Sequence, residues 1–332
     1  MKWPPLWQRR RQAFSRKIRE SGLWILRLTF AFIFLLTTPL SAWSSEKLAY
    51  YSDYFSFIGR DTNGFVAFAL DNNRGVDGSE YQAEHFGVLY DEKSGWVKLV
   101  GMGSYENVSG ELEQIPDSPH FTFKGMPETG IIVVSRDNGL VLEIDPIITH
   151  LAEKKDTRKL NWGSAKAALN WKDRKIPGRV IYEHLIYRNW NRLTRTYAGT
   201  WDNFQGFYLA IGSGDVRTWQ DLYLRCEGNG NTRRTKGFVT IDGCSGTIHA
   251  ARFNAYDKAY TWGFYRWPQK WDIEITRDEK EGARTGELIL RQISRKNQGN
   301  WVIGGFAMVV VHGELRLNGK GTPVLGFAEL IK

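Results

Sequence analysis

The sequence predicts an all-β protein built from short antiparallel strands, and two observations carry this prediction. Many short segments alternate apolar and polar side chains, which is the periodicity of a half-buried strand. In the clearest one, Trp271, Ile273 and Ile275 share one face and the polar residues between them share the other. Turn-forming pairs such as Asn138-Gly139 separate these segments. Such spacing is typical of a β-barrel or a β-sandwich.

The predicted strands fall into two series. The first comprises residues 65–70, 84–90, 96–100, 121–124, 131–134 and 141–144. The second comprises residues 179–187, 204–211, 221–226, 236–241, 247–253, 271–276, 287–293, 304–313 and 324–330. The stretch between them is charged and less apolar, and it predicts a short helix around residues 164–173. We therefore expect a first β domain at residues 46–150, a linker with a short helix at 151–177, and a second β domain at 178–332.

Residues 1–45 have the features of a secretory signal peptide. Eight basic residues and one acid give this segment a net charge of +7, and an apolar run from Leu28 to Leu36 follows the basic stem. The small residues Ala42 and Ser44 suit cleavage after Ser44. An uncleaved anchor is the alternative, since the uncharged stretch is just long enough to cross a bilayer. Either way the sequence predicts an exported protein, periplasmic or extracellular, that could associate with the membrane through this segment.

The rest of the chain shows no sign of a nucleic-acid partner, a metal or a cofactor. Of the formal charge of +9, only +2 is left beyond residue 45, so no basic surface for nucleic acid is indicated. The six histidines are scattered, with none at ligand spacing from another. Phosphate-loop, complete dinucleotide-binding and hydrolase serine motifs are absent from the sequence.

The two cysteines, Cys226 and Cys244, form an even pair in an exported chain, which favours a disulfide. In a plain hairpin, however, they would lie at opposite ends of the strand between them. A disulfide needs Cα atoms within about 7 Å of each other. Two buried thiols are therefore the alternative.

The most suggestive polar residues lie in the segment VIYEHLIY, residues 180–187. In a regular strand Tyr182 and His184 share one face, and Glu183 lies on the other. Tyr182 and His184 are therefore our first candidate catalytic residues, as a hydrogen-bonding or proton-transferring pair in a pocket. A histidine satisfied within a β core is the alternative.

A second candidate acid and several aromatic residues follow. Asp202, if it faced a dry cavity, would keep its proton and could act as an acid; otherwise it is a turn residue. Tryptophans concentrate in the later part of the chain. We expect Trp201, Tyr208, Trp262 and Trp271 to line an apolar ligand cavity, with core packing as the alternative for each.

Five segments, in this order, resemble those of a known family. GRVIYEHLIY is similar to its Tyr/Glu-His strand, TWDNFQGFYLAI to its Trp-rich strand, and DLYLRCEGNG to the next strand and turn. WGFYRWPQKWDIEIT resembles its Tyr-Pro-x-x-Trp segment, and GTPVLGFAELIK its closing Gly-x-x-Glu-Leu strand. The family is that of the carotenoid hydratase and AttH-like double-lipocalin (calycin) proteins. The resemblance covers about residues 177–332 well and the earlier part only in general strand layout.

The resemblance implies two lipocalin-like antiparallel β-barrels side by side. The family's hydratases add water across a double bond of an acyclic carotenoid, and its relatives include cyclases. His184 matches the family histidine, and Asp202 is the nearest candidate acid. Where the hydratases carry a tryptophan two residues after that histidine, this chain has Ile186, which weakens the implied reaction more than the implied fold.

Two hypotheses follow. In the first, an exported protein without a cofactor binds an apolar lipid or isoprenoid in the second barrel. In the second, a hydratase- or cyclase-like enzyme acts on an isoprenoid double bond through His184, Asp202 and Tyr182. A third is an envelope-assembly module whose barrels are filled with side chains.

Overall fold

The computed structural model describes residues 48–331 except 78–79, 107–114, 156–157, 191–203, 228–233, 242–243, 261–265, 280–281 and 299–305. The chain from Glu46 to Lys332 forms one compact unit. The predicted signal segment, residues 1–45, lies outside the described residues. Among those described, no helix combines the length and the apolar character needed to cross a membrane.

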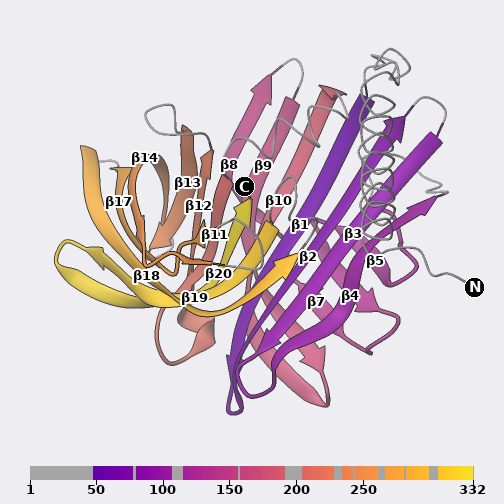
Figure 1. The fold of residues 1–332 in the computed structure, drawn as a ribbon, viewed down its shortest axis with the longest axis horizontal. Coiled ribbons are helices and arrows are strands. Elements are labelled where there is room, and N and C mark those ends of the chain that lie inside the picture. Colours follow the sequence, from indigo (N-terminus) through magenta and orange to yellow (C-terminus); the bar gives the residue numbers. More distant parts are fainter. Residues whose placement is uncertain are drawn as a thin grey trace, which may run out of the picture. The chain divides into compact units, whose positions relative to one another are not determined.

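The first half of this unit is a ten-stranded antiparallel sheet (Figure 1). Its strands are β1 (Leu48–Asp61), β2 (Gly64–Asp77), β3 (Glu80–Asp91), β4 (Gly95–Glu106), β5 (Phe121–Met126), β6 (Gly130–Ser135), β7 (Val141–Ile144), β8 (Ile148–Lys155), β9 (Arg158–Trp171) and β10 (Arg174–Trp190). They are ordered β4-β3-β2-β1-β10-β9-β7-β6-β5, and β8 pairs with β9 off this path. The first and last long strands, β1 and β10, are therefore neighbours in the middle of the sheet.

The second half is a closed eight-stranded barrel, drawn in orange to yellow in Figure 1. Its strands are β11 (Phe204–Ile211), β12 (Gln220–Glu227), β13 (Arg234–Ile241), β14 (Cys244–Tyr256), β17 (Lys270–Glu279), β18 (Gly282–Gln298), β19 (Phe306–Leu317) and β20 (Lys320–Ile331). A short ribbon, β15 (Ala259–Tyr260) with β16 (Arg266–Trp267), and the 3-10 turn η3 (Val216–Thr218) are inserted in it. Pairing of β11 with β20 closes the barrel.

Strand β19 contributes apolar side chains both to the barrel interior and to the contact between the barrel and the first sheet. Successive side chains of a strand point to opposite faces. Ala307, Val309 and Val311 accordingly pack in the barrel interior, whereas Met308 and Val310 pack on the outside, against residues of the first sheet. Since both faces of β19 are buried, its sequence is a continuous apolar run rather than an alternating one.

The contact between sheet and barrel is a mainly apolar and aromatic cluster. Trp162 of β9 stacks on Tyr223 of β12 with ring centroids 5.9 Å apart. Tyr54 of β1 lies 4.8 Å from Tyr208 of β11, measured between ring centroids. Aromatic pairs at such distances contribute about 0.5–1.5 kcal/mol beyond their burial. The second candidate ligand residue, Tyr208, is therefore part of this contact.

The helix predicted around residues 164–173 is wrong: this stretch is strand β9 and its turn. Buried side chains alternate with more exposed ones along residues 165–171, which is a strand period. Lys172 and Asp173, with φ of 49° and 59°, form the two-residue turn that joins β9 to β10. Pairing along fourteen positions with β10 outweighs the helix propensity of the alanines and lysine in this segment.

The linker predicted at residues 151–177 is likewise made of strands, the end of β8, β9 and the start of β10. The predicted strand at 179–187 belongs to β10 and pairs with β1 and β9 in the first sheet, not with the barrel. From the sequence we placed the domain boundary at the stretch where charged residues become frequent. Among these charges, Lys154, Lys159, Lys166, Lys172, Asp173 and Lys175 are exposed on strands and a turn that complete the first sheet.

The cysteines lie too far apart along the sheet for a disulfide. Cys226 of β12 is buried and pairs with Thr235 of β13, whereas Cys244 of β14 pairs with Ile241 at the other end of β13. Six residues of a strand span about 20 Å. Of the two alternatives that the sequence left open, the disulfide is therefore incompatible with this register.

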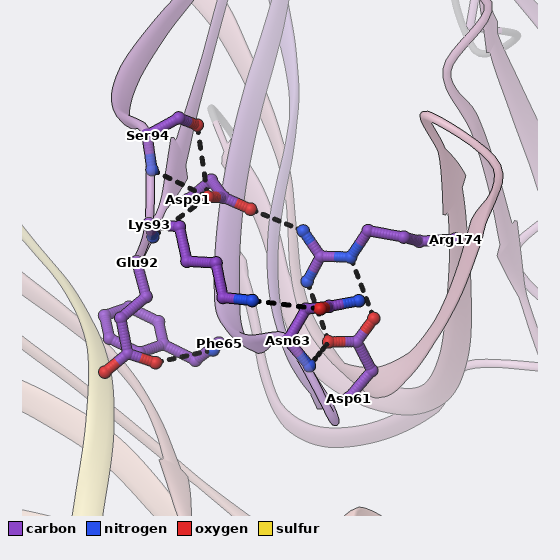
Figure 2. Close-up of polar contacts among 8 residues, drawn as sticks. All are labelled: Asp61, Asn63, Phe65, Asp91, Glu92, Lys93, Ser94 and Arg174. Atoms are coloured by element: carbon purple, nitrogen blue, oxygen red, sulfur yellow. Dashed lines mark hydrogen bonds and ion pairs between the residues drawn. The ribbon is translucent and has the colours of Figure 1, made fainter.

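Three hairpin turns of the first sheet are joined by one arginine (Figure 2). Arg174 donates from Nε and Nη2 to the two carboxylate oxygens of Asp61, each at 2.8 Å, and from Nη1 to Oδ2 of Asp91 at 2.5 Å. Asp91 also accepts the backbone N–H groups of Lys93 and Ser94. The contact ties the β1–β2, β3–β4 and β9–β10 turns together.

We predict that Arg174→Met destabilises the protein by about 1–2 kcal/mol, because two partly buried carboxylates are then left facing each other. Urea unfolding at pH 7 measures this. The matched control is Arg136→Met, whose ion pair with Asp117 is about half exposed and should matter little. Equal effects of the two substitutions would contradict the role assigned to Arg174.

Candidate functional site

A cavity of about 610 Å³ opens on the first sheet, beside β5, β8, β9 and β10. Its apolar lining consists of Ile115, Phe123, Met126, Pro127, Ile147 and Ile186. Its polar lining consists of Glu128, Thr149, Lys159, Asn161, Tyr182 and His184, and Gly125 completes it. Two of the three residues proposed as catalytic from the sequence, Tyr182 and His184, thus line one cavity.

The alternation of β10 positions these two side chains. Tyr182 and His184 point to the cavity side, and Glu183 between them points to the cluster between sheet and barrel, where it contacts Tyr208. The direction of the three side chains therefore agrees with the strand assignment made from the sequence. The cavity lies over the first sheet, whereas the sequence placed this strand in the second domain.

Asp53 of β1 organises the floor of the cavity. It lies directly opposite His184 in the β1–β10 register, so both side chains share one face of the sheet. Its carboxylate accepts hydrogen bonds from Tyr182 Oη and from His184 Nδ1, the latter at 2.8 Å. Arg74 Nη1 of β2 donates to the second oxygen at 2.5 Å. Asp53 and Arg74 are both buried, so the four side chains form one charged network beneath the cavity.

The network keeps Asp53 ionised. Complete burial acts to raise its pKa, but the positive charge of Arg74 and the hydrogen bonds from His184 and Tyr182 outweigh burial and lower the pKa to about 2. For Tyr182, burial and the charge of Asp53 raise the pKa well above its usual value near 10. Tyr182 therefore remains a hydroxyl that donates to Asp53.

The contact with Asp53 also fixes the chemistry available to His184. A carboxylate only accepts, so the ring donates its Nδ1–H to Asp53. Nε2 is then the nitrogen left for a molecule in the cavity, and it can accept a hydrogen bond or take a proton. An ionised Asp53 would stabilise the imidazolium formed by such a transfer.

The remaining predicted site residues do not join this site. Trp271 is fully buried inside the barrel, where its Nε1 donates to Gln205 Oε1 at 3.1 Å. Tyr208 lies between sheet and barrel, as described above. Trp201, Asp202 and Trp262 lie outside the described residues.

Sequence reasoning missed Asp53 and Arg74. The available signal was a single acid inside an otherwise aromatic segment, YYSDYFSF, since a charge in such a strand needs a partner. The partner itself could not be identified, because only the β1–β2 and β1–β10 registers bring Arg74 and His184 to Asp53.

A second polar cluster lies between sheet and barrel. Tyr208 Oη is 3.1 Å from Glu183 Oε1 and 3.3 Å from Glu329 Oε2. Burial, with the charges of Glu183 and Asp71, raises the pKa of Glu329 to about 8. A hydroxyl has one proton to donate, so a protonated Glu329 can donate to Tyr208 while Tyr208 donates to Glu183.

A serine, a histidine and an aspartate also meet at this contact, but not in the order of a hydrolase triad. Ser164 Oγ donates to Asp221 at 2.6 Å, and His150 Nε2 lies 2.9 Å from the same hydroxyl. In a triad the histidine lies between serine and acid. Here the serine is in the middle, and Arg179 neutralises the acid. The group joins β9 of the sheet to β12 of the barrel.

No gathering of three or more histidine, cysteine or acidic side chains suited to a metal ion occurs among the described residues. The network around Asp53 instead consists of a cation, a phenol and an imidazole on one carboxylate.

Comparison with known proteins identifies the fold. No family model and no curated protein matches the sequence. The solved structures that are similar over most of the chain include the following two. CghA, determined with Sch210972, has a TM-score of 0.52 at 12% identity, covering 85% of this chain and 87% of CghA. The AttH-like protein NE1406 from Nitrosomonas europaea has a TM-score of 0.51 at 9% identity, covering 88% and 95%.

At these low sequence identities, the similarity to CghA and NE1406 shows the fold alone. The protein belongs to the double lipocalin-like class of architecture, with a closed eight-stranded barrel and a half-barrel sheet, as in AttH-like structures. The predicted fold class is confirmed, although the first half of the protein is an open sheet rather than a second closed barrel.

Proposed function

We propose that the protein binds a small, mainly apolar molecule, a lipid or an isoprenoid, in the cavity above Tyr182 and His184. The observation that carries the proposal is a cavity of about 610 Å³ that is lined on one part by apolar side chains and whose floor holds a fixed polar network. Small-molecule sites have this size, and they combine apolar lining residues with oriented polar groups. A ligand with one hydroxyl or carbonyl could bind its polar end at His184.

From the sequence we expected the ligand in the second barrel, whereas the proposed cavity lies on the first sheet. The described interior of the barrel is filled by apolar side chains, Trp271 among them. CghA, which shares the fold, has been determined with Sch210972, and this supports a small molecule as the type of ligand.

We propose that this binding takes place outside the cytoplasm, because residues 1–45 have the order of a secretory signal. Sequencing the N-terminus of protein from the cell envelope tests this. A start at Ser45 supports export with cleavage, whereas recovery of the protein only from the cytoplasm would exclude export.

A second candidate function, acid–base catalysis, is favoured by the Asp53–His184 pair. In it, His184 Nε2 exchanges a proton with the bound molecule and Asp53 stabilises the imidazolium. Asp53 itself is not the acid, because its pKa is about 2. A hydratase- or cyclase-like reaction at an isoprenoid double bond would place His184 as the proton-transferring group.

The variant His184→Ala separates the two functions. We expect it to weaken binding of the molecule extracted from the native protein about fivefold, the effect of losing one hydrogen bond. If the protein is an enzyme, His184→Ala also abolishes conversion of that molecule at saturating concentration. Conversion at the wild-type rate would exclude the catalytic role, and unchanged affinity would exclude His184 from the site. Tyr182→Phe, which keeps the ring in place, serves as the matched comparison.

A further inference from the structure

The strand register extends the polar row that begins at Asp53 across the floor of the Tyr182–His184 cavity. His184 of β10 lies opposite Asp53 of β1 on one side and opposite Asn161 of β9 on the other. The three strands are neighbours in the first sheet (Figure 1). Directly opposite residues of an antiparallel pair share one face, with Cβ atoms about 4.5–5.5 Å apart. Asn161 therefore lies beside His184, and both residues line the cavity.

His184 and Asn161 offer the cavity complementary hydrogen-bonding groups. His184 donates its Nδ1–H to Asp53, which leaves the lone pair of Nε2 as an acceptor. The side-chain amide of Asn161 supplies two N–H donors. Asn161 is half-buried, and its amide has no hydrogen-bond partner among the described residues. An acceptor and a donor thus lie side by side on the cavity floor.

The formal charges at this cavity balance each other. Glu128 and Lys159, the two charged residues of the described lining, have opposite signs, and both are exposed. Beneath the floor, Asp53 and Arg74 form a buried ion pair. The charges of these two pairs cancel, so the lining favours neither an anion nor a cation. We therefore expect the polar end of the ligand to be neutral.

We propose that His184 and Asn161 together hold one hydroxyl group, and that the ligand of this cavity is a neutral apolar alcohol. The hydroxyl donates its proton to His184 Nε2, and its oxygen accepts an N–H of Asn161. A carbonyl or ether oxygen can only accept, so it would use Asn161 and leave Nε2 without a donor. This inference rests on the binding function proposed above and names the chemical class of the ligand.

Calorimetric titration of the full mature protein at pH 8 tests the proposal with four probes that share one isoprenoid chain: farnesol, farnesal, farnesyl methyl ether and farnesene. We expect farnesol to bind about tenfold more tightly than the aldehyde or the ether, because each of these leaves Nε2 unpaired. Farnesene, which has no oxygen, should bind more weakly still. Equal affinity for all four probes would overturn the hydroxyl site and leave the apolar cavity in place. Binding of none of them would also contradict the function proposed for the cavity.

Two variants separate the two hydrogen bonds. Asn161→Leu, which nearly keeps the shape of the side chain, should weaken binding of all three oxygen-containing probes about fivefold and leave farnesene unchanged. His184→Ala should remove the preference for farnesol over the ether. Asn170→Leu, on the same strand β9 but outside the cavity lining, is the control and should change no affinity. If Asn161→Leu weakens farnesene as much as farnesol, or weakens neither, Asn161 does not bind the hydroxyl.

Discussion

Replacing Asp53 with alanine is expected to lower the free energy of unfolding by about 3–5 kcal/mol, because the substitution leaves a buried charge without its counterion. The guanidinium of Arg74 loses the carboxylate 2.5 Å away, and Tyr182 and His184 each lose an acceptor. Urea unfolding at pH 7 measures the change, with exposed Asp145→Ala as the control, expected to cost less than about 0.5 kcal/mol.

The double variant Asp53→Ala/Arg74→Met shows whether the uncompensated charge is the cause. Removing both members of a buried ion pair costs less than removing one. We therefore expect the double variant to be more stable than Asp53→Ala by about 1–2 kcal/mol. A loss below about 1 kcal/mol for the single variant, or no recovery in the double one, would contradict the network described beneath the cavity.

The second large effect that we expect is a pH dependence of the free energy of unfolding, caused by Glu329. Its pKa is raised from 4.5 to about 8 in the folded protein. Between these values the folded state holds a proton that the unfolded state has lost, so stability falls as pH rises from about 4.5 to 8 and is level above. The full shift corresponds to about 5 kcal/mol, and because Glu329 is partly exposed we expect about 2–3 kcal/mol.

Unfolding of wild type and Glu329→Gln at pH 4.5, 6.5 and 8.5 tests this dependence. Glutamine keeps the shape and cannot ionise, so the variant should gain about 2–3 kcal/mol relative to wild type between pH 4.5 and 8.5. The exposed Glu287→Gln should show no such trend. Parallel profiles for wild type and Glu329→Gln would mean that Glu329 titrates normally.

The parts of the fold that the sequence predicted are those set by local pattern. The alternation through Trp271, Ile273 and Ile275 is strand β17, and all three side chains lie in the barrel core. The same period-two rule assigned Tyr182 and His184 to one face of their strand. Such predictions need no knowledge of which strands become neighbours.

The errors arose where pairing decides the outcome. Residues 164–171 contain good helix formers, and only the fourteen-residue register with β10 shows that they are a strand. The turn at Lys172 and Asp173 lacks the glycine that usually marks a two-residue hairpin, so the sequence gives little sign of it. Asp53 was missed for the related reason that its partners lie 21, 129 and 131 residues away.

We propose above that an apolar molecule occupies the Tyr182–His184 cavity. The most direct test is mass spectrometry of the organic extract of mature protein purified from its native host. Thr149→Trp places an indole at the exposed lip of the cavity, and Ile148→Trp adds the same ring to an adjacent, 66% exposed position that does not line it. We expect a lipid or isoprenoid in near-stoichiometric amount from wild type and from Ile148→Trp, and its loss from Thr149→Trp. No extractable molecule from wild type, or an equal amount from Thr149→Trp, would contradict it.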